Sequence, residues 1–319
     1  MSGGIKIAAV VGATASGKTA LAVALAQRLD GEVISADSMQ IYQGLSISTA
    51  KPTPEEQQGI PHHLIDFVPL QETFSVAHYC ELAHQVIADV TARGRLPIVC
   101  GGTGLYVDSL LNNLLFPDIP DNQALRDALA AEWEQYGERG GEVMLARLTA
   151  VDPETAARLH PADRKRILRA LEVFTLTGVT LSEWNRRSRS EPDRYRSIIV
   201  GLGWRNRQTL YDRIDRRVDD MLAAGLIEEA RRFYAETNGK TAVQAIGCKE
   251  LLPFLRGEEP LQTAVERLKR ETRRLAKRQL TWFRRNDKIE WIYADDYDTF
   301  DALAARAEEV IRQSPARTT

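Results

Sequence analysis

A glycine-rich segment near the start of the chain carries the most specific chemical pattern in the sequence. Residues 12–19 read Gly-Ala-Thr-Ala-Ser-Gly-Lys-Thr and fit the pattern G-x-x-x-x-G-K-[ST] of a phosphate-binding loop. In such a loop, backbone N–H groups and the lysine bind linked phosphates at the positive end of a helix dipole, while the last hydroxyl meets Mg²⁺. Read alone, the loop suggests a nucleotide such as ATP. The residues expected at the phosphates are Gly12, Ala13, Thr14, Ala15, Ser16, Gly17, Lys18 and Thr19, and Thr19 is also the expected magnesium ligand.

A second candidate is Asp37, which follows the short apolar segment Glu32–Ser35. A carboxylate just beyond the carboxyl end of a strand lies at the edge of the sheet where α/β proteins bind their ligands. It could bind Mg²⁺, act as a general base, or cap the N-terminus of a helix. The residue type and its position leave these three alternatives open.

The third candidate is the turn Gly101-Gly102-Thr103-Gly104, which follows the apolar segment Leu96–Cys100. Glycines have no Cβ and allow a ligand to approach the backbone closely, and the Thr103 hydroxyl can donate a hydrogen bond. A plain glycine turn leading into a helix is the alternative. The density of glycine and the position at the same sheet edge favour contact with a ligand.

These candidates are positioned by apolar segments that alternate with helical ones in the first 115 residues. Such alternation predicts a parallel α/β sheet whose loops meet at one edge. The expected strands are Ile5–Val11, Glu32–Ser35, Leu64–Phe67 and Leu96–Cys100, and the expected helices are Ala20–Leu29 and Val76–Arg93.

From about residue 120 the pattern becomes helical, and strand character returns only at Ser197–Gly203. The expected helices before that point are Ala124–Tyr136, Gly141–Ala150, Pro153–Leu159 and Arg164–Thr177; Arg207–Phe233 and Leu261–Phe283 follow, with a late strand at Ile289–Tyr293. The sequence thus predicts a P-loop NTPase-like α/β core, residues 1–119 and 197–319, in which helices flank a parallel sheet. Residues 120–196 would form an inserted, mainly helical domain.

The composition is that of a soluble globular protein: 44% of the 319 residues are hydrophobic, 27% are charged, and the formal net charge is −2. No apolar run approaches the ~20 residues of a membrane helix, and the start of the chain lacks a signal-peptide pattern. Three widely spaced cysteines predict a reducing cytoplasm and no disulfide framework. His62 and His63 follow Pro61 in a loop, where we expect structural packing or packing beside a substrate.

Basic residues are unevenly distributed along the chain. Between Arg267 and Arg285 there are nine basic residues and one acidic residue, Glu271. An amphipathic helix with Leu268, Leu275 and Trp282 on its apolar stripe would direct most of these charges to other faces. Such a helix favours contact with a nucleic acid or another polyphosphate, and ordinary surface charge is the alternative.

Several of these segments together resemble the tRNA dimethylallyltransferases of the bacterial type, also called tRNA isopentenyltransferases or the IPP transferase family. The resemblance runs in order along nearly the whole chain, to about Tyr293, and one departure is Ala13, where the family usually has proline. It is carried by residues 12–19, Ile34–Tyr42, Ser48–Pro52, Pro61–His63, Gly101–Tyr106, Arg169–Phe174 and Leu275–Arg284.

The resemblance implies transfer of a dimethylallyl group from dimethylallyl diphosphate to N6 of adenine 37 in tRNA, with release of diphosphate. The phosphate loop would then hold a leaving group together with Mg²⁺, and no nucleotide would be hydrolysed there. Asp37 matches the family's general base, Thr103 a threonine beside the reacting centre, and Arg217 an arginine that clamps the diphosphate. An enzyme acting on free adenine nucleotides, a P-loop kinase or ATPase, and a plain RNA-binding module are the competing interpretations.

The resemblance also implies where tRNA is bound, with the helical insertion holding the anticodon stem-loop and a monomer being sufficient. We add Arg273 and Lys277 of the basic helix to these expected contacts. The residues concerned are Asp37, Ser38, Met39, Gln40, Thr103, Arg126, Lys165, Arg166, Ile167, Leu168, Arg169, Gln244, Ala245, Ile246, Gly247, Cys248, Lys249, Arg273 and Lys277.

Overall fold

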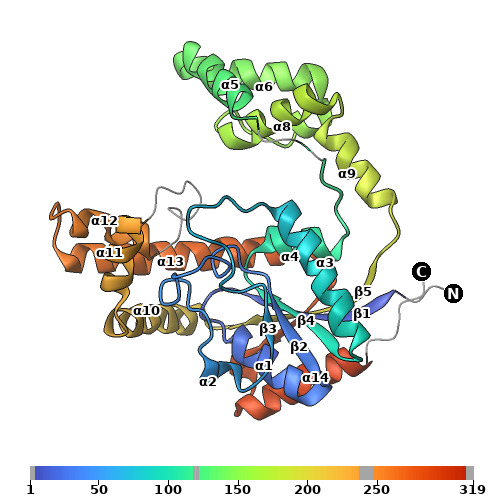
Figure 1. Ribbon diagram of the computed structural model, residues 1–319, viewed down its shortest axis with the longest axis vertical. Helices are drawn as coiled ribbons and strands as arrows, with labels where there is room; N and C mark the ends of the chain where they lie inside the picture. Colours follow the sequence, from blue (N-terminus) through green and yellow to red (C-terminus); the bar gives the residue numbers. More distant parts are fainter. Residues whose placement is uncertain (1–3, 118, 120–121, 237–246, 314–319) are drawn as a thin grey trace. The chain divides into compact units, whose positions relative to one another are not determined.

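The chain divides into two compact units in the computed structural model, which describes residues 4–117, 119, 122–236 and 247–313 (Figure 1). The first unit comprises Met1–Leu111 and Arg194–Thr319, and the second comprises Asn112–Asp193. The second unit interrupts the first in sequence, and its borders lie near, and before, those expected for the insertion at 120–196. Among the described residues, no helix combines the length and the apolar character that crossing a membrane requires.

A six-stranded, all-parallel sheet forms the centre of the first unit, with the strand order β3-β2-β4-β1-β5-β6. Central strands of such a sheet are covered on both faces and read as continuous apolar runs, as β1 does. The predicted parallel α/β core is therefore confirmed. The strands are β1 (Ile5–Gly12), β2 (Gly31–Ser35), β3 (His62–His63), β4 (Leu96–Gly101), β5 (Tyr195–Gly203) and β6 (Ile289–Tyr293).

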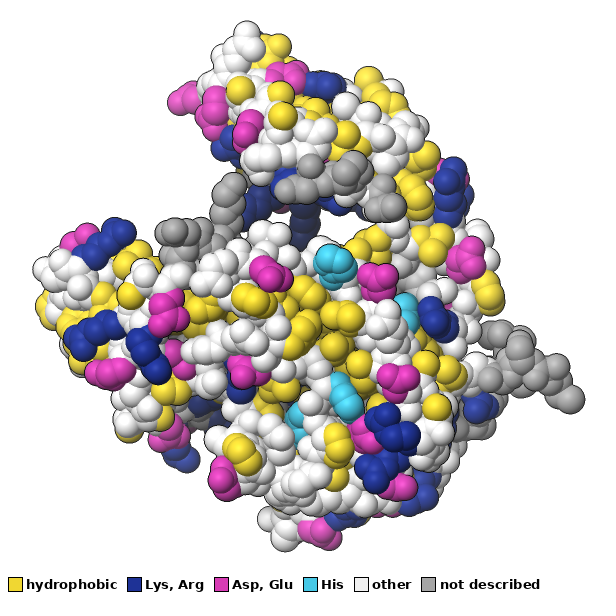
Figure 2. Space-filling model, viewed as in Figure 1, with side chains coloured by type: hydrophobic (Ala, Val, Ile, Leu, Met, Phe, Trp, Pro, Cys, Tyr) yellow, Lys and Arg dark blue, Asp and Glu magenta, His cyan; other side chains and the backbone are white. Residues whose placement is uncertain are grey.

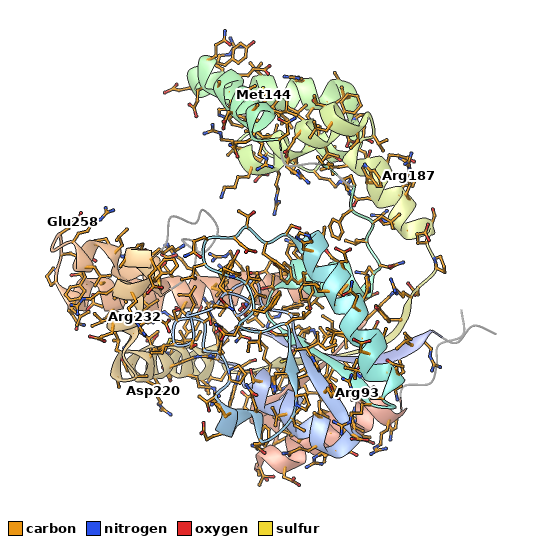
Figure 3. The ribbon with its side chains drawn as sticks, viewed as in Figure 1. Arg93, Met144, Arg187, Asp220, Arg232 and Glu258 are labelled. Carbon is orange, nitrogen blue, oxygen red and sulfur yellow. The ribbon has the colours of Figure 1, made fainter. Side chains whose placement is uncertain are left out.

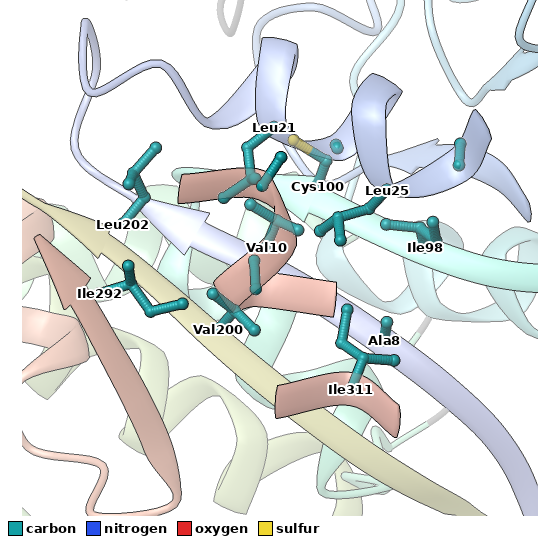
Figure 4. Packing of buried hydrophobic residues seen from close by; sticks show 14 of the residues in the cluster. Ala8, Val10, Leu21, Leu25, Ile98, Cys100, Val200, Leu202, Ile292 and Ile311 are labelled. Carbon is teal, nitrogen blue, oxygen red and sulfur yellow. The ribbon is translucent and has the colours of Figure 1, made fainter. Parts of the chain in front are cut away.

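Helices pack against this sheet. Leu21 and Leu25 of α1 and Ile311 of α14 join Val10 and Val200 of the sheet in one buried apolar cluster (Figure 4). This packing holds α1, which begins within the phosphate loop at Lys18, against the sheet. The helices of the first unit are α1 (Lys18–Leu29), α2 (Pro54–Gln57), α3 (Val76–Ala92), α4 (Gly104–Leu111), α10 (Arg207–Ala223), α11 (Leu226–Glu236), α12 (Cys248–Leu255), α13 (Leu261–Phe283) and α14 (Phe300–Gln313).

The second unit is helical throughout its regular structure. Met144, which is fully buried, lies between its helices (Figure 3) and packs with Leu129, Leu148, Ile167 and Leu171. The unit therefore has an apolar core of its own. Its helices are α5 (Gln123–Gln135), α6 (Gly140–Val151), α7 (Pro153–Ala156), α8 (Arg164–Thr177) and α9 (Leu181–Ser190).

The structure corrects three of the predicted elements. The strand expected at Leu64–Phe67 is instead β3 at His62–His63, and Leu64 and Asp66 both have φ of 57°, which a strand excludes. The helix expected at Arg207–Phe233 is two helices, since Gly225 between α10 and α11 has φ of 99°. Strand β5 begins at Tyr195, before the expected Ser197, because Tyr195 pairs with Ile5 of β1.

Candidate active site

The phosphate loop connects β1 to α1, and its glycines are required by its geometry. Gly17 has φ of 99°, a conformation that other residues rarely adopt. A Cβ on Gly12 would lie 2.6 Å from the carbonyl oxygen of Leu202 in the neighbouring strand β5. Trp204 and Arg213 hold the outer side of the loop, where they donate hydrogen bonds to the carbonyls of Ser16 and Ala15 at 3.2 and 3.0 Å.

Backbone N–H groups of the loop fall into two sets. The N–H of Thr14 donates to Oε1 of Gln279 at 2.8 Å, and the N–H of Ser16 donates to the carbonyl of Ala13 at 3.2 Å. Within the described ranges, hydrogen bonds are absent at the N–H groups of the other positions in this turn, which are Ala15, Gly17, Lys18 and Thr19. These amides, at the positive end of α1, are available to phosphate oxygens.

Two cationic side chains lie beside the loop under conditions that favour an anion. Burial lowers the pKa of Lys18, and Cys100 and Asp37 oppose that shift; its Nζ donates to the carbonyl of Ala13 at 3.3 Å. Burial also lowers the pKa of the half-buried Arg217, against the attraction of Glu56 and Asp37. In the part of the chain that the structure describes, Arg217 has no hydrogen bond or ion pair. A bound diphosphate would provide an anionic partner for both Lys18 and Arg217.

Asp37 and Thr103 are brought together by two hydrogen bonds between the segments that follow β2 and β4. The N–H of Ser38 donates to Oγ1 of Thr103 at 3.0 Å, and the N–H of Thr103 donates to the carbonyl of Ala36 at 3.2 Å. A Cβ on Gly101 would lie 2.1 Å from that same carbonyl oxygen, so only glycine permits this contact.

The environment of Asp37 removes one of its three alternative roles. Its Oδ1 accepts a hydrogen bond from the N–H of Met39 at 2.9 Å, which closes a turn of the Asx type. Residues 38–41 form turns and no helix begins there, so Asp37 is not a helix cap. Metal binding and general-base catalysis remain.

A pocket is lined by both Lys18 of the phosphate loop and Asp37. Gln40 is fixed in its wall, because its amide donates to the carbonyls of Thr49 and Ala50 and accepts from the Ser35 hydroxyl at 3.1 Å. The lining residues are Lys18, Thr19, Val33, Ser35, Asp37, Gln40, Pro52, His62, Ile65, Cys100 and Gly101.

The two histidines have different environments. His62 lines the pocket, and its Nδ1 donates to the carbonyl of Ile60 at 2.9 Å. His63 instead bonds the buried Glu32 at 2.6 Å, away from the pocket lining. Burial opposes ionisation of Glu32, yet hydrogen bonds from Arg93 and His63 outweigh it and hold the pKa of that carboxyl below its usual value.

Oxygen atoms of the pocket wall suit a hard cation such as Mg²⁺. Thr19 and Ser35 contribute hydroxyls and Asp37 a carboxylate, which are ligand types that Mg²⁺ accepts. Within the described residues there is no group of three or more Asp, Glu, His or Cys side chains that could enclose a metal. Of these oxygens, the Thr19 hydroxyl lies at the start of α1 and is the one that could hold Mg²⁺ beside phosphates in the loop.

Comparison with known proteins decides which family carries this arrangement. Residues 40–286 match the family described as IPP transferase. The chain belongs to the IPP transferase family. It is 48% identical over 308 residues to a tRNA dimethylallyltransferase of Geobacillus kaustophilus, with 96% of this chain and 95% of that protein covered. A tRNA dimethylallyltransferase of Caldanaerobacter subterraneus is 46% identical over 303 residues, 94% of this chain and 95% of that one.

Solved structures of IPP transferases are similar as well. The full-length tRNA isopentenylpyrophosphate transferase of Bacillus halodurans has a TM-score of 0.71 and 43% identity, covering 96% of this chain and 95% of that chain. A eukaryotic dimethylallyltransferase acting on tRNA has a TM-score of 0.83 and 29% identity, covering 98% and 81% of the two chains.

In this IPP transferase, two arginines of the helical unit share one buried carboxylate. Glu172 of α8 accepts hydrogen bonds from Nε of Arg126 at 2.9 Å and from Arg169 at 2.7 Å. Burial opposes ionisation of Glu172, but the two guanidiniums outweigh it and keep the pKa of the carboxyl low. Lys165 and Arg166 are exposed, and Lys and Arg side chains appear at several places on the surface of this unit (Figure 2).

Ile167, also expected at the tRNA, is fully buried in the core of its unit, so its side chain cannot reach a partner. Leu168 packs partly against that same core. The amphipathic pattern of α8 accounts for this, because residues three and four apart share its apolar face.

Several basic residues of helix α13 are paired in the structure, although the sequence between Arg267 and Arg285 has a single acidic residue. Carboxylates from other helices and loops pair with several of its residues: Asp215 with Arg273 at 2.5 Å, Asp219 with Lys269 at 2.6 Å, and Glu259 with Arg267. Asp215 and Asp219 lie on α10, distant in sequence from α13, whereas Glu259 lies eight positions before Arg267. Among the described residues, no ion pair involves the exposed side chains of Lys277, Arg278, Arg284 and Arg285.

The last expected tRNA segment is described only in part. Gln244, Ala245 and Ile246 lie outside the described residues. Gly247 contacts Ser48 so closely that a Cβ would lie 2.9 Å from the Ser48 Cβ, and Cys248 is fully buried. Lys249 is exposed and lies 3.6 Å from Glu250.

Two further residues of the site were not identified from the sequence. Gln279 bonds the phosphate loop and the glycine turn at once, and it lies within the motif Leu275–Arg284 that carried the resemblance. The buried Glu229 accepts from the N–H groups of Ser46, Ile47 and Ser48 at 2.7–2.9 Å and so fixes the loop behind Gln40. No local pattern marks Glu229, since its partners are about 180 positions away.

Proposed function

We propose that the chain is a tRNA dimethylallyltransferase, which transfers a dimethylallyl group from dimethylallyl diphosphate to N6 of adenine 37 and releases diphosphate. The observation that carries the proposal is one pocket in which a phosphate loop with Lys18 meets Asp37. The names of the relatives agree with it, since they are tRNA dimethylallyltransferases at 45–48% identity. A carboxylate beside a diphosphate grip suits group transfer to a nucleophile that must lose a proton.

Diphosphate is the leaving group of the proposed reaction. When the allylic C–O bond breaks, its electron pair goes to the diphosphate, which gains negative charge. The free amides of the loop, Lys18 and Arg217 stabilise that charge, because fixed donors aimed at developing charge cost no reorganisation during the reaction. Magnesium, held by Thr19 and the substrate phosphates, would supply further neutralisation of the diphosphate.

The nucleophile is an exocyclic amine whose lone pair is delocalised into the adenine ring, which makes it weak. As the new C–N bond forms, a proton on N6 must leave, and the Asp37 carboxylate accepts it. Oδ1 of Asp37 is already engaged by the N–H of Met39, which fixes the carboxylate and leaves Oδ2 for the amine. The adenine must first leave the stack of the anticodon loop to reach a closed site.

Further features support the setting of this reaction. Cys80, Cys100 and Cys248 are all buried and free, as expected in a reducing cytoplasm. All residues that line the pocket come from the first unit, and we propose that a monomer carries out the reaction.

The test is a transfer assay with radiolabelled dimethylallyl diphosphate. Unmodified tRNA, AMP and ATP are offered in parallel, with Mg²⁺ present. Label in tRNA and none in AMP is the expected result, and AMP labelling would instead identify an enzyme of free nucleotides. Hydrolysis of ATP without transfer of label would contradict the proposal.

A further inference from the structure

Gln279 of α13 connects the two halves of the candidate active site. Its Oε1 accepts the hydrogen bond from the N–H of Thr14 in the phosphate loop, at 2.8 Å. Its Nε2 donates to the carbonyl of Gly102 in the glycine turn, at 3.0 Å. A backbone N–H only donates and a carbonyl only accepts, so the orientation of this amide is determined by its partners.

The glycine turn is shaped to receive this side chain. A Cβ on Gly102 would lie 2.3 Å from Nε2 of Gln279, and a Cβ on Gly104 would lie 2.2 Å from the ring of Trp282. One turn beyond Gln279, Nε1 of Trp282 donates to Asp108 of α4 at 2.7 Å. Helix α13 is therefore held against the turn at two successive positions, and Gln279 has little freedom to move.

One partner of Gln279 lies on the loop that binds the leaving group, and the other lies on the turn beside the proposed base. Thr14 is part of the loop that grips the diphosphate. Gly102 directly precedes Thr103, whose Oγ1 accepts the N–H of Ser38 next to Asp37. A near-attack geometry requires that the leaving group and the base stay at a fixed separation, and a misplacement of about 1 Å can cost about 100-fold in rate.

We propose that Gln279 is a positioning residue that sets the separation between the diphosphate grip and the Asp37–Thr103 pair. By engaging the N–H of Thr14, it also leaves the amides of Ala15, Gly17, Lys18 and Thr19 as the set that faces phosphate. This inference rests on the proposed function for its rate predictions.

Gln279→Met and Gln279→Glu separate the contributions of the two hydrogen bonds. Methionine has a similar length and makes neither bond. Glutamate keeps an acceptor for Thr14, loses the donor to Gly102, and adds a negative charge beside an anion site. In Gln279→Met we expect kcat to fall about 10- to 100-fold. The Kd of this variant for inorganic diphosphate should change less than about threefold. Gln279→Glu should lower kcat and also weaken the binding of diphosphate. The matched control is Gln262→Met on the same helix, since Gln262 is exposed and, among the described residues, its side chain bonds only Glu266.

The experiment combines single-turnover transfer to tRNA, calorimetric binding of inorganic diphosphate, and amide hydrogen exchange of the purified full chain. In Gln279→Met, the amides of residues 12–17 and 101–104 should exchange faster together, while the control resembles the wild type. The loss of single-turnover rate caused by Thr103→Ala should be about tenfold smaller in the Gln279→Met background than in the wild type. The effects of substitutions at coupled residues do not add.

Two results would overturn the inference. One is a single-turnover rate of Gln279→Met within twofold of the wild type. The other is a rate loss that is additive with Thr103→Ala and accompanied by unchanged exchange in both segments. Failure of the proposed function is recognised separately, because wild-type protein would then transfer no label to tRNA while the exchange readout still reports on the connection.

Discussion

The two units of the chain present positive charge to anions by different means. In the first unit, backbone amides of the phosphate loop, Lys18 and Arg217 lie in or beside a pocket, partly removed from water. In the second unit, guanidiniums of Arg126 and Arg169 are about half exposed and are oriented by one buried carboxylate, Glu172. Charge in a pocket acts through fixed geometry, whereas exposed charge is screened by salt. The buried charges of the first unit therefore suit catalysis on a small anion, and the exposed charges of the second unit suit the binding of a polyanion.

The largest expected effect belongs to Asp37 in the first unit. Asn at this position keeps an oxygen for the N–H of Met39 but cannot accept the proton of the amine. General-base catalysis contributes about 10²–10⁴-fold, so kcat of Asp37→Asn should fall by that amount while the Kd for tRNA stays within a few fold. Single-turnover transfer and a tRNA binding titration measure the two quantities. Weakened tRNA binding with full chemistry at saturation would show that Asp37 is not the base.

Glu172→Gln should affect binding and leave chemistry unchanged, the opposite of Asp37→Asn. The variant removes the charge that orients Arg126 and Arg169, and a hydrogen bond to a charged group is worth about 1.5–3 kcal/mol. We expect roughly a tenfold increase in the Kd for tRNA, with kcat at saturating tRNA unchanged. Titration of the variant and the wild type with tRNA at two salt concentrations measures this change in Kd. An unchanged Kd in a variant that remains folded would mean that this pair of arginines does not grip tRNA.

A smaller effect is expected on α13, where two basic residues that look equivalent in sequence differ in the structure. Lys277 is exposed, and Arg273 is paired with Asp215 at 2.5 Å. Lys277→Ala should lower the slope of log Kd for tRNA against log salt by about 1, as loss of one phosphate contact does. Arg273→Ala should instead lower the melting temperature, because it leaves Asp215 without its partner. Equal salt slopes for both variants would contradict this distinction.

The smallest effect concerns His84, far from the phosphate chemistry. Burial, with a contribution from Arg194, lowers the pKa of His84 to about 4, and its Nδ1 lies 2.5 Å from the Tyr195 hydroxyl. Between an unfolded pKa of about 6.5 and the folded value, the unfolded chain binds the extra proton, so wild-type stability should decrease as pH falls through this window. His84→Gln should show a flatter free energy of unfolding over the same range. Chemical denaturation at pH 7, 5.5 and 4.5 checks the sign.

Patterns that depend on neighbouring residues could be read from the sequence. The phosphate loop, the strands around β1 and β4, and helix α13 follow from apolar periodicity and from glycine spacing, and the structure has them where expected. Periodicity failed where one residue changes the backbone locally. Gly225 divides a predicted helix, and Leu64 with positive φ displaces a predicted strand.

What the sequence could not reveal is pairing between distant segments. The basic helix has few acidic neighbours in sequence because Asp215 and Asp219, which pair with Arg273 and Lys269, belong to α10. The link from Gln279 to Thr14 joins residues 265 positions apart, so spacing alone could not indicate it. Helices α9, α12 and α14 were not predicted, and each acquires its apolar partner only in the folded chain.

The central claim is that the phosphate loop holds the diphosphate of the prenyl donor during the reaction, and not ATP. The most direct measurement is the stoichiometry of a single turnover with dimethylallyl diphosphate, unmodified tRNA and Mg²⁺, in the complete absence of nucleoside triphosphates. The account predicts one diphosphate released for each dimethylallyl group transferred to tRNA. A requirement for ATP, or release of orthophosphate in place of diphosphate, would contradict it.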